Sequence, residues 1–153
     1  AVTERYGGGT AMASLAAGYS EGNIGRALEL VGSDEFTRLR DKIYEGMEGA
    51  LRGKIGNALE FTAFLEENRE SINIILDIML LYFRDMLVVR QTGSENMLIN
   101  SDKKDIIVNN ARIYSDSRLL RTIDAIGESR RALKQNANYQ LVVDNLMIKL
   151  RED

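Results

Sequence analysis

The sequence contains no cysteine and no histidine in its 153 residues. Without cysteine there can be no disulfide framework, no thiolate metal site and no thiol nucleophile. The absence of histidine also removes the usual zinc sites, Ser-His and Cys-His catalysis, and imidazole acid–base chemistry. An enzyme built from this chain would have to rely on carboxylates, lysine, tyrosine or serine. We therefore expect no metal site of the common kinds, and the missing cysteines fit a reducing cytoplasm.

Proline is absent as well. Because proline normally supplies about 5% of residues, its absence favours long helices joined by short glycine or asparagine turns. Apolar residues make up 44% of the chain and charged residues 28%, which is typical of a globular protein. The most apolar stretch, residues 71–89, is interrupted by Asp77, Arg84 and Asp85. A membrane span needs roughly 20 residues nearly free of charge, so this stretch is predicted to be a core helix.

Apolar residues recur at spacings of three and four through most of the chain, and no alternating strand pattern competes with them. The sequence therefore predicts an all-α helical bundle. A residue able to cap a helix precedes most of the predicted segments, for example Ser33, either Ser101 or Asp102, and either Ser115 or Asp116. The predicted helices cover about residues 11–17, 23–31, 33–52, 55–65, 69–91, 101–113, 115–134 and 139–150.

Arg84 and Asp85 stand side by side in the predicted core helix. Side chains of neighbouring helical residues point about 100° apart, so we expect these two not to face each other. Each is predicted to find its own partner at a helix–helix junction, which would make the pair structural rather than catalytic.

The net charge is −3, but residues 103–134 hold eight basic residues against four acidic ones. This local excess of positive charge allows a shallow patch for a phosphate backbone. A solvated helix face with local ion pairs explains the same pattern, and we favour that interpretation. The basic residues of this segment are Lys103, Lys104, Arg112, Arg118, Arg121, Arg130, Arg131 and Lys134.

Near the start of the chain stands the run Gly22-Asn23-Ile24-Gly25-Arg26-Ala27-Leu28. It resembles the start of the second-sensor helix in the lid domain of AAA-type ATPases. Where the ATP-hydrolysing relatives have an arginine that reaches a nucleotide phosphate, this chain has Gly25. The run is therefore similar to the non-hydrolysing delta-prime branch of bacterial clamp-loader subunits, and the resemblance implies no nucleotide or other cofactor.

The C-terminal third carries a second resemblance. Between about Arg118 and Leu150, an amphipathic segment leads into Asn136-Ala137-Asn138-Tyr139-Gln140-Leu141 and a last apolar segment. This order is similar to the end of the collar domain of DNA polymerase III clamp-loader subunits, as is the Arg-Asp pair inside the long apolar helix. The resemblance implies that residues 1–32 are the end of a lid domain and that residues 33–153 form a helical collar, with the chain being a fragment of a longer subunit.

What the resemblance implies about function follows from that family. The collar would hold a five-membered ring together with the gamma/tau and delta subunits, and it would meet DNA and the sliding clamp only indirectly. No catalytic residue, small-molecule substrate or membrane contact is implied for this chain. Two alternatives stay open: the lid and collar of an ATP-hydrolysing gamma/tau subunit, or a helical nucleic-acid-binding module that uses residues 103–134.

The last predicted helix is apolar on more than one face. Either two neighbouring helices enclose it or part of it meets another subunit, and the resemblance favours the second explanation for some of its surface. The candidate subunit-interface residues are Arg130, Tyr139, Gln140, Val143, Asp144 and Met147.

Overall fold

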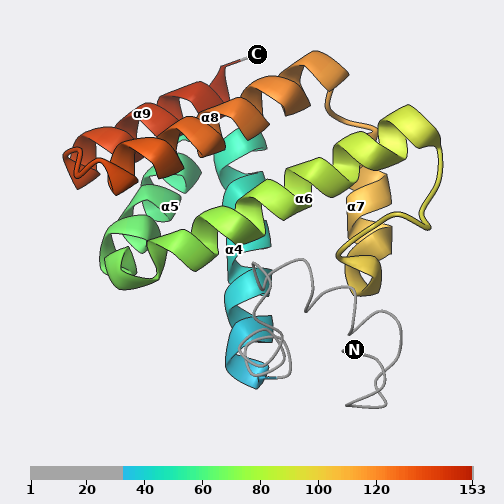
Figure 1. The fold of residues 1–153 in the computed structure, drawn as a ribbon, viewed down its shortest axis with the longest axis horizontal. Coiled ribbons are helices and arrows are strands. Elements are labelled where there is room, and N and C mark those ends of the chain that lie inside the picture. Colours follow the sequence, from blue (N-terminus) through green and yellow to red (C-terminus); the bar gives the residue numbers. More distant parts are fainter. Residues whose placement is uncertain (1–32, 153) are drawn as a thin grey trace.

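The computed structural model describes residues 33–152, and within that range the fold is all-α, as predicted. The predicted helices at 11–17 and 23–31, together with Gly25, lie outside the described residues. Two short 3₁₀ turns, Arg69–Ser71 and Ser101–Lys103, precede the third and fourth helices. With the labels of Figure 1, the helices are α4 (Asp34–Arg52), α5 (Ile55–Glu67), α6 (Ile72–Thr92), α7 (Lys104–Ala111), α8 (Asp116–Lys134) and α9 (Tyr139–Arg151).

The long helix α6 is the centre of the domain, as its sequence predicts. It crosses the molecule with α8 and α9 along one side, α4 passing behind, and α5 and α7 near its two ends (Figure 1). Between residues 72 and 89 only Asn73 is exposed. A helix that is apolar on nearly every side can be stable only when protein surrounds it. Among residues 33–152, none of the helices combines the length and apolar character that crossing a membrane requires.

Local capping fixes the start of three helices. In each, a side-chain oxygen accepts a hydrogen bond from the backbone N–H three residues further on, which satisfies one of the unpaired donors of the first turn. At its other end, α6 stops at Gly93, whose φ of 66° lies in the left-handed region that glycine tolerates best. The three caps are Ser33 to Phe36 at 3.0 Å, Ser115 to Arg118 at 3.1 Å, and Asn138 to Leu141 at 3.1 Å.

The start of α7 differs from the prediction. Neither Ser101 nor Asp102 caps it; both lie in the preceding 3₁₀ turn, and α7 begins at Lys104 without a side-chain cap. The carboxylate of Asp102 instead pairs with the guanidinium of Arg40 on α4. This long-range ion pair removes Asp102 from local capping. The helix is also shorter than predicted, because it ends at Ala111.

The Arg84–Asp85 prediction is wrong in both parts, because the two side chains contact each other and their other partners lie in the loop after α6. The Arg84 guanidinium lies 2.8 Å from Asp85 Oδ1 and also donates to the Met97 carbonyl at 2.9 Å. The fully buried Asp85 carboxylate accepts from the backbone N–H of Ile99 at 3.0 Å and of Asn100 at 2.8 Å. Both side chains therefore turn toward the loop that follows α6, and not toward a helix–helix junction.

Helices α4 and α5 pack closely at Gly46. A Cβ atom built on Gly46 would stand 2.5 Å from Phe61 Cδ2, closer than any real carbon contact. Phe61 itself is buried in the core. The glycine is therefore needed for the approach of the two helices, and α5 in turn supports α9.

Candidate interaction surface

Helices α8 and α9 form an outer layer of the domain and lie side by side (Figure 1). The connection between them, residues 135–138, is short, and its Asn136 takes a left-handed φ of 59°, a conformation that asparagine adopts more readily than most residues. An ion pair between Lys149 of α9 and Glu128 of α8, at 2.5 Å, ties the two helices together further along. This layer is where the sequence predicted an interface.

The inner face of α9 is buried in the core. It packs against α8, α5 and α4. Two of the predicted interface residues belong to this face: Val143 is 1% exposed and Met147 is 6% exposed. In this fold neither side chain is accessible to a partner. Of the two explanations that the sequence left open, enclosure by neighbouring helices is therefore the one that applies to this face. The face consists of Val142, Val143, Leu146, Met147 and Leu150.

The outer face of α9 is exposed and still partly apolar. Leu141 is 68% exposed and Ile148 is 61% exposed. A spacing of seven residues places them on one face of the helix, with Asp144 between them. Gln140 and Asp144, both predicted interface residues, are exposed here and joined by a hydrogen bond of 2.8 Å from Gln140 Nε2 to Asp144 Oδ1.

The two other predicted interface residues are half-buried and bonded within the domain. The Tyr139 hydroxyl donates to the Leu65 carbonyl of α5 at 2.6 Å, and the Arg69 guanidinium lies 4.2 Å from the centre of its ring. Burial raises the pKa of the Tyr139 phenol above its ordinary value. Arg130 forms an ion pair with Asp77 of α6. Both residues fix the outer helices onto the bundle.

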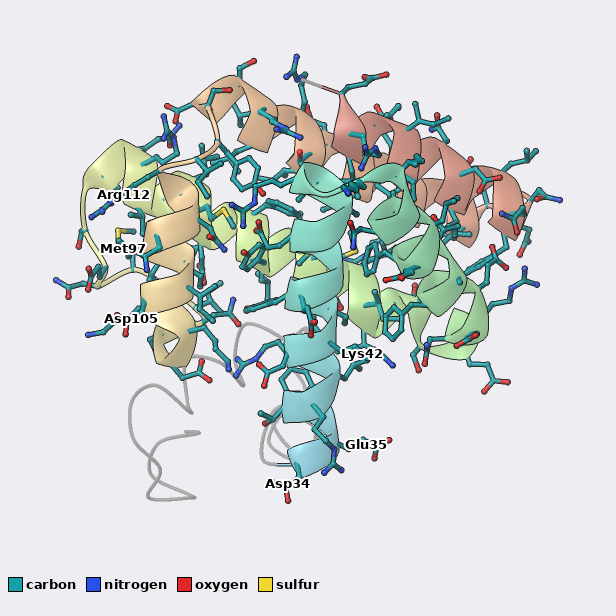
Figure 2. The ribbon with its side chains drawn as sticks, turned by 180° about the vertical axis from the view of Figure 1, so that it is seen from behind. Asp34, Glu35, Lys42, Met97, Asp105 and Arg112 are labelled. Carbon is teal, nitrogen blue, oxygen red and sulfur yellow. The ribbon has the colours of Figure 1, made fainter. Side chains whose placement is uncertain are left out.

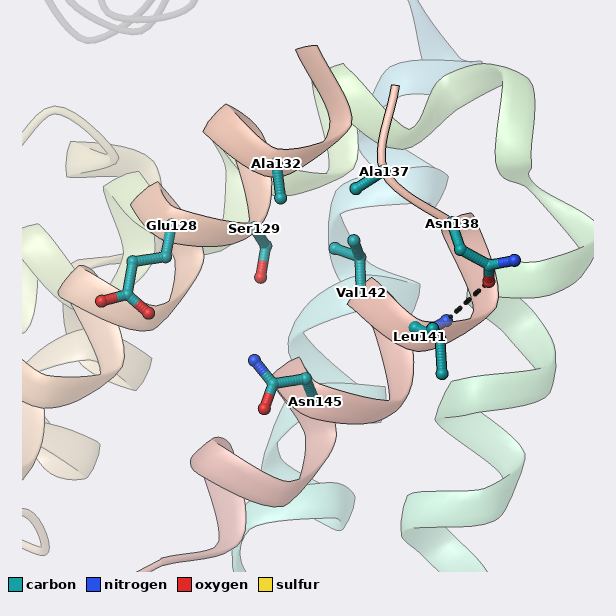
Figure 3. A pocket seen from close by; sticks show the side chains of 8 residues that line it. All are labelled: Glu128, Ser129, Ala132, Ala137, Asn138, Leu141, Val142 and Asn145. Atoms are coloured by element: carbon teal, nitrogen blue, oxygen red, sulfur yellow. Dashed lines mark hydrogen bonds between the residues drawn. The ribbon is translucent and has the colours of Figure 1, made fainter. Parts of the chain in front are cut away.

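A groove of about 350 Å³ lies between α8 and α9 near the turn that joins them (Figure 3). Its walls carry small or apolar side chains from both helices and from the turn that joins them. Polar groups line it as well: a carboxylate and a hydroxyl from α8, one amide from the turn and one from α9. The lining residues are Glu128, Ser129, Ala132, Ala137, Asn138, Leu141, Val142 and Asn145.

Sequence reasoning missed Leu141 and Ile148 as surface residues. Their spacing of seven, out of register with Val142, Leu146 and Leu150, was the available signal. Other large apolar residues are also exposed on the described domain, and Figure 2 shows one of them, Met97 of the loop after α6, beside α7. These further exposed residues are Ile55, Leu59, Met97, Ile106, Ile113 and Leu120.

A polar cluster outside this layer surrounds Glu48 of α4. Its carboxylate accepts hydrogen bonds from the hydroxyls of Tyr82 at 2.6 Å and Tyr114 at 2.9 Å. Burial, and then the negative charge of Glu48, raise the pKa of both phenols well above the ordinary range, so both stay neutral donors. The cluster joins α4 and α6 to the segment before α8. Within residues 33–152, no group of acidic side chains is arranged to hold a metal ion.

Several cations of the basic segment are also bonded inside the domain. Lys103 pairs with Asp41 at 2.7 Å, and Arg130 pairs with Asp77. Arg118 donates to two carbonyls at helix ends, at 3.4 and 3.3 Å. Arg118, Arg130 and Lys103 therefore hold elements together, which agrees with the interpretation of local ion pairs. The remaining five, Lys104, Arg112, Arg121, Arg131 and Lys134, are exposed on α7 or α8 or just beyond α7.

Comparison with known proteins gives two matches. The family described as "DNA polymerase III, delta subunit, C terminal" matches residues 35–152. DNA polymerase III subunit delta′ of Bacillus subtilis (strain 168) is 31% identical over 136 residues, which cover 85% of this chain and 40% of that protein. The chain thus spans about 40% of the length of this relative. No solved structure matches.

Proposed function

This chain belongs to the family of the C-terminal domain of the DNA polymerase III delta subunit, and on that premise we propose that it is the assembly domain of a delta-prime subunit of the bacterial clamp loader. In this proposal residues 33–153 form the collar that holds the subunit in a ring with gamma/tau and delta. Residues 1–32 are the end of the preceding lid domain. The domain performs no catalysis, binds no cofactor, and meets DNA and the sliding clamp only through the assembled ring in the bacterial cytoplasm.

The observation that carries the proposal is the exposed apolar face of α9 in a domain that matches this family along nearly its whole length. Leu141 and Ile148 leave a large part of their side chains in water. Burying such a side chain fully contributes about 1.5–3 kcal/mol, so a partner that covers both gains considerably. A few buried apolar anchors surrounded by polar contacts are typical of the centre of a protein–protein interface.

The test is association with the other clamp-loader subunits of the same organism. The complete polypeptide that carries this chain is mixed with purified gamma/tau and delta in the absence of ATP, and the molar mass of the eluting species is measured by light scattering after size-exclusion chromatography. We expect a stable hetero-complex. A sample that stays monomeric with every subunit contradicts the proposal.

The same preparation separates the alternatives. ATP binding at micromolar concentration would favour the ATP-hydrolysing gamma/tau type. Binding to duplex DNA that weakens steeply with salt would favour a nucleic-acid-binding module. Either result without subunit association would replace the assembly proposal.

A further inference from the structure

From the groove between α8 and α9 we infer the chemistry of the partner that covers it: a helix of a neighbouring subunit that inserts one large apolar side chain into the groove and places a lysine or arginine against Asp144. The inference rests on the proposed assembly function and deepens it. It assigns a binding role to the groove and to the outer face of α9, and it leaves the buried residues Val143 and Met147 to the core.

The size and lining of the groove fit an apolar side chain. An apolar cavity of about 150 Å³ is large enough to hold benzene, and this groove has a volume of about 350 Å³. The side chains of Ala132, Ala137 and Val142 leave the space between the helices open (Figure 3). The exposed Leu141 extends the apolar surface at the groove. A leucine, methionine or phenylalanine of a partner would therefore exchange contact with water for contact with apolar atoms on several sides.

The basic group of the partner is inferred from Asp144, which stands beside the groove on the outer face of α9 and is not part of the groove lining. Glu128 is already neutralised by Lys149 at 2.5 Å. Asp144 accepts a hydrogen bond from Gln140, but no cation of residues 33–152 forms an ion pair with it. Along the outer face of α9, one acidic side chain therefore stands between two apolar ones, in the order Leu141, Asp144 and Ile148. A partner helix with a cation between apolar residues complements that order.

The groups on the outer face of α9 argue against a nucleic acid as the occupant, and the exposed cations of α8 (Arg121, Arg131 and Lys134) do not line the groove. A phosphate backbone would meet the carboxylate of Asp144 with like charge, and the apolar side chains of Leu141 and Ile148 offer it no hydrogen-bond donor. A cation beside a covered apolar anchor is shielded from water, which makes the ion pair stronger than an isolated surface pair.

Three substitutions test the inference in the complete subunit. Leu141→Glu places a charge on the apolar rim, Asp144→Lys reverses the charge, and Ala137→Phe fills the groove from the exposed turn. Two controls change similar groups elsewhere: Met97→Glu near α7, where the side chain is 57% exposed, and Asp124→Lys on the exposed side of α8. Because these five residues are exposed, the variants are expected to fold, and circular-dichroism melting curves verify it.

Affinity for gamma/tau and for delta is measured by isothermal titration calorimetry. We expect each of the three groove variants to raise the Kd for one of these subunits at least tenfold, whereas both controls stay within about twofold. The loss in Asp144→Lys should shrink as salt rises, since surface charges are screened beyond roughly 10 Å at 0.1 M.

Each contrary result has a separate meaning. If the unchanged subunit binds and all three groove variants bind equally well, the groove is not the binding site, while the assembly function stands. If only Asp144→Lys binds normally, the partner group facing it is not basic, and the inferred chemistry is wrong. If the unchanged subunit binds neither gamma/tau nor delta, the proposed function itself fails.

Discussion

Replacing Asp85 by asparagine should destabilise the domain by about 3 kcal/mol, although the two side chains have the same shape. The carboxylate is fully buried and accepts four hydrogen bonds. Oδ1 accepts from Ile99 N at 3.0 Å and from Arg84 at 2.8 Å. Oδ2 accepts from the backbone N–H of Asn100 at 2.8 Å and from its side-chain amide at 3.0 Å.

The magnitude follows from what an amide can replace. Asparagine keeps one accepting oxygen and puts an NH₂ donor at the other position. In either orientation of the amide, the donors at Oδ1 (Ile99 and Arg84) or those at Oδ2 (Asn100) therefore face another donor. A buried donor without an acceptor costs about 1–3 kcal/mol, and hydrogen bonds to a charged group contribute about 1.5–3 kcal/mol. Arg84 can turn partly toward water, but the N–H groups of Ile99 and Asn100 belong to a fixed loop. We therefore expect a loss of about 3 kcal/mol, which corresponds to roughly 10 °C in Tm for a domain of this size.

Urea unfolding followed by circular dichroism measures the effect. Asp144→Asn is the matched control, because Asp144 is exposed and a surface substitution of this kind changes stability by less than about 0.5 kcal/mol. Hydrogen exchange at the amides of Ile99 and Asn100 should also accelerate in Asp85→Asn. Equal midpoints for the two variants would refute the reasoning that this carboxylate holds the loop after α6.

Two further predictions concern pH and packing. Burial, followed by the charge of Glu48, raises the folded-state pKa of Tyr82 above the ordinary value of about 10, so the unfolded chain releases this proton first as pH rises. The stabilisation from this neutral phenol is therefore complete below pH 10 and is lost above it, by about 1.4 kcal/mol per pH unit. In urea unfolding between pH 9 and 11, the free energy of unfolding should fall less steeply with pH in Tyr82→Phe than in the unchanged protein. Equal slopes of this free energy against pH would contradict the assignment. Gly46→Ala should lower the free energy of unfolding by about 1–3 kcal/mol, because the added Cβ would clash with Phe61. Gly56→Ala should instead raise it by up to about 1 kcal/mol, because a Cβ added there meets nothing within 4 Å. Thermal melting compares the two alanine variants, and a shift in the same direction for both would show that close packing of α4 on α5 is not the cause.

Much of the helical architecture could be predicted because its determinants are local. Ser33, Ser115 and Asn138 each bond to a backbone N–H three residues away. Gly93 stops α6 through its own backbone conformation. The even distribution of apolar residues around α6 likewise predicted a surrounded central helix, and the structure confirms it. Interactions of this kind need no knowledge of the rest of the fold.

Other features depend on residues far apart in the sequence. Asp102 was a good capping candidate, yet Arg40, 62 positions earlier in the chain, binds its carboxylate. Helical geometry argued that Arg84 and Asp85 point apart, but the loop after α6 offers acceptors and donors that draw both side chains to one side. Local spacing contains no information about which distant group will compete for a side chain.

The sequence by itself determined that residues 33–152 are helical, where α4, α5, α8 and α9 begin, and that the longest of these helices is central, because capping and periodicity act within one or two turns. The tertiary structure alone decided which side of α9 faces the core. Its apolar residues fall on two faces, and the positions of α4, α5 and α8 bury Val143 and Met147 while leaving Leu141 and Ile148 in water. Burial depends on which neighbouring helices arrive at each face, and a single helix pattern does not contain that information.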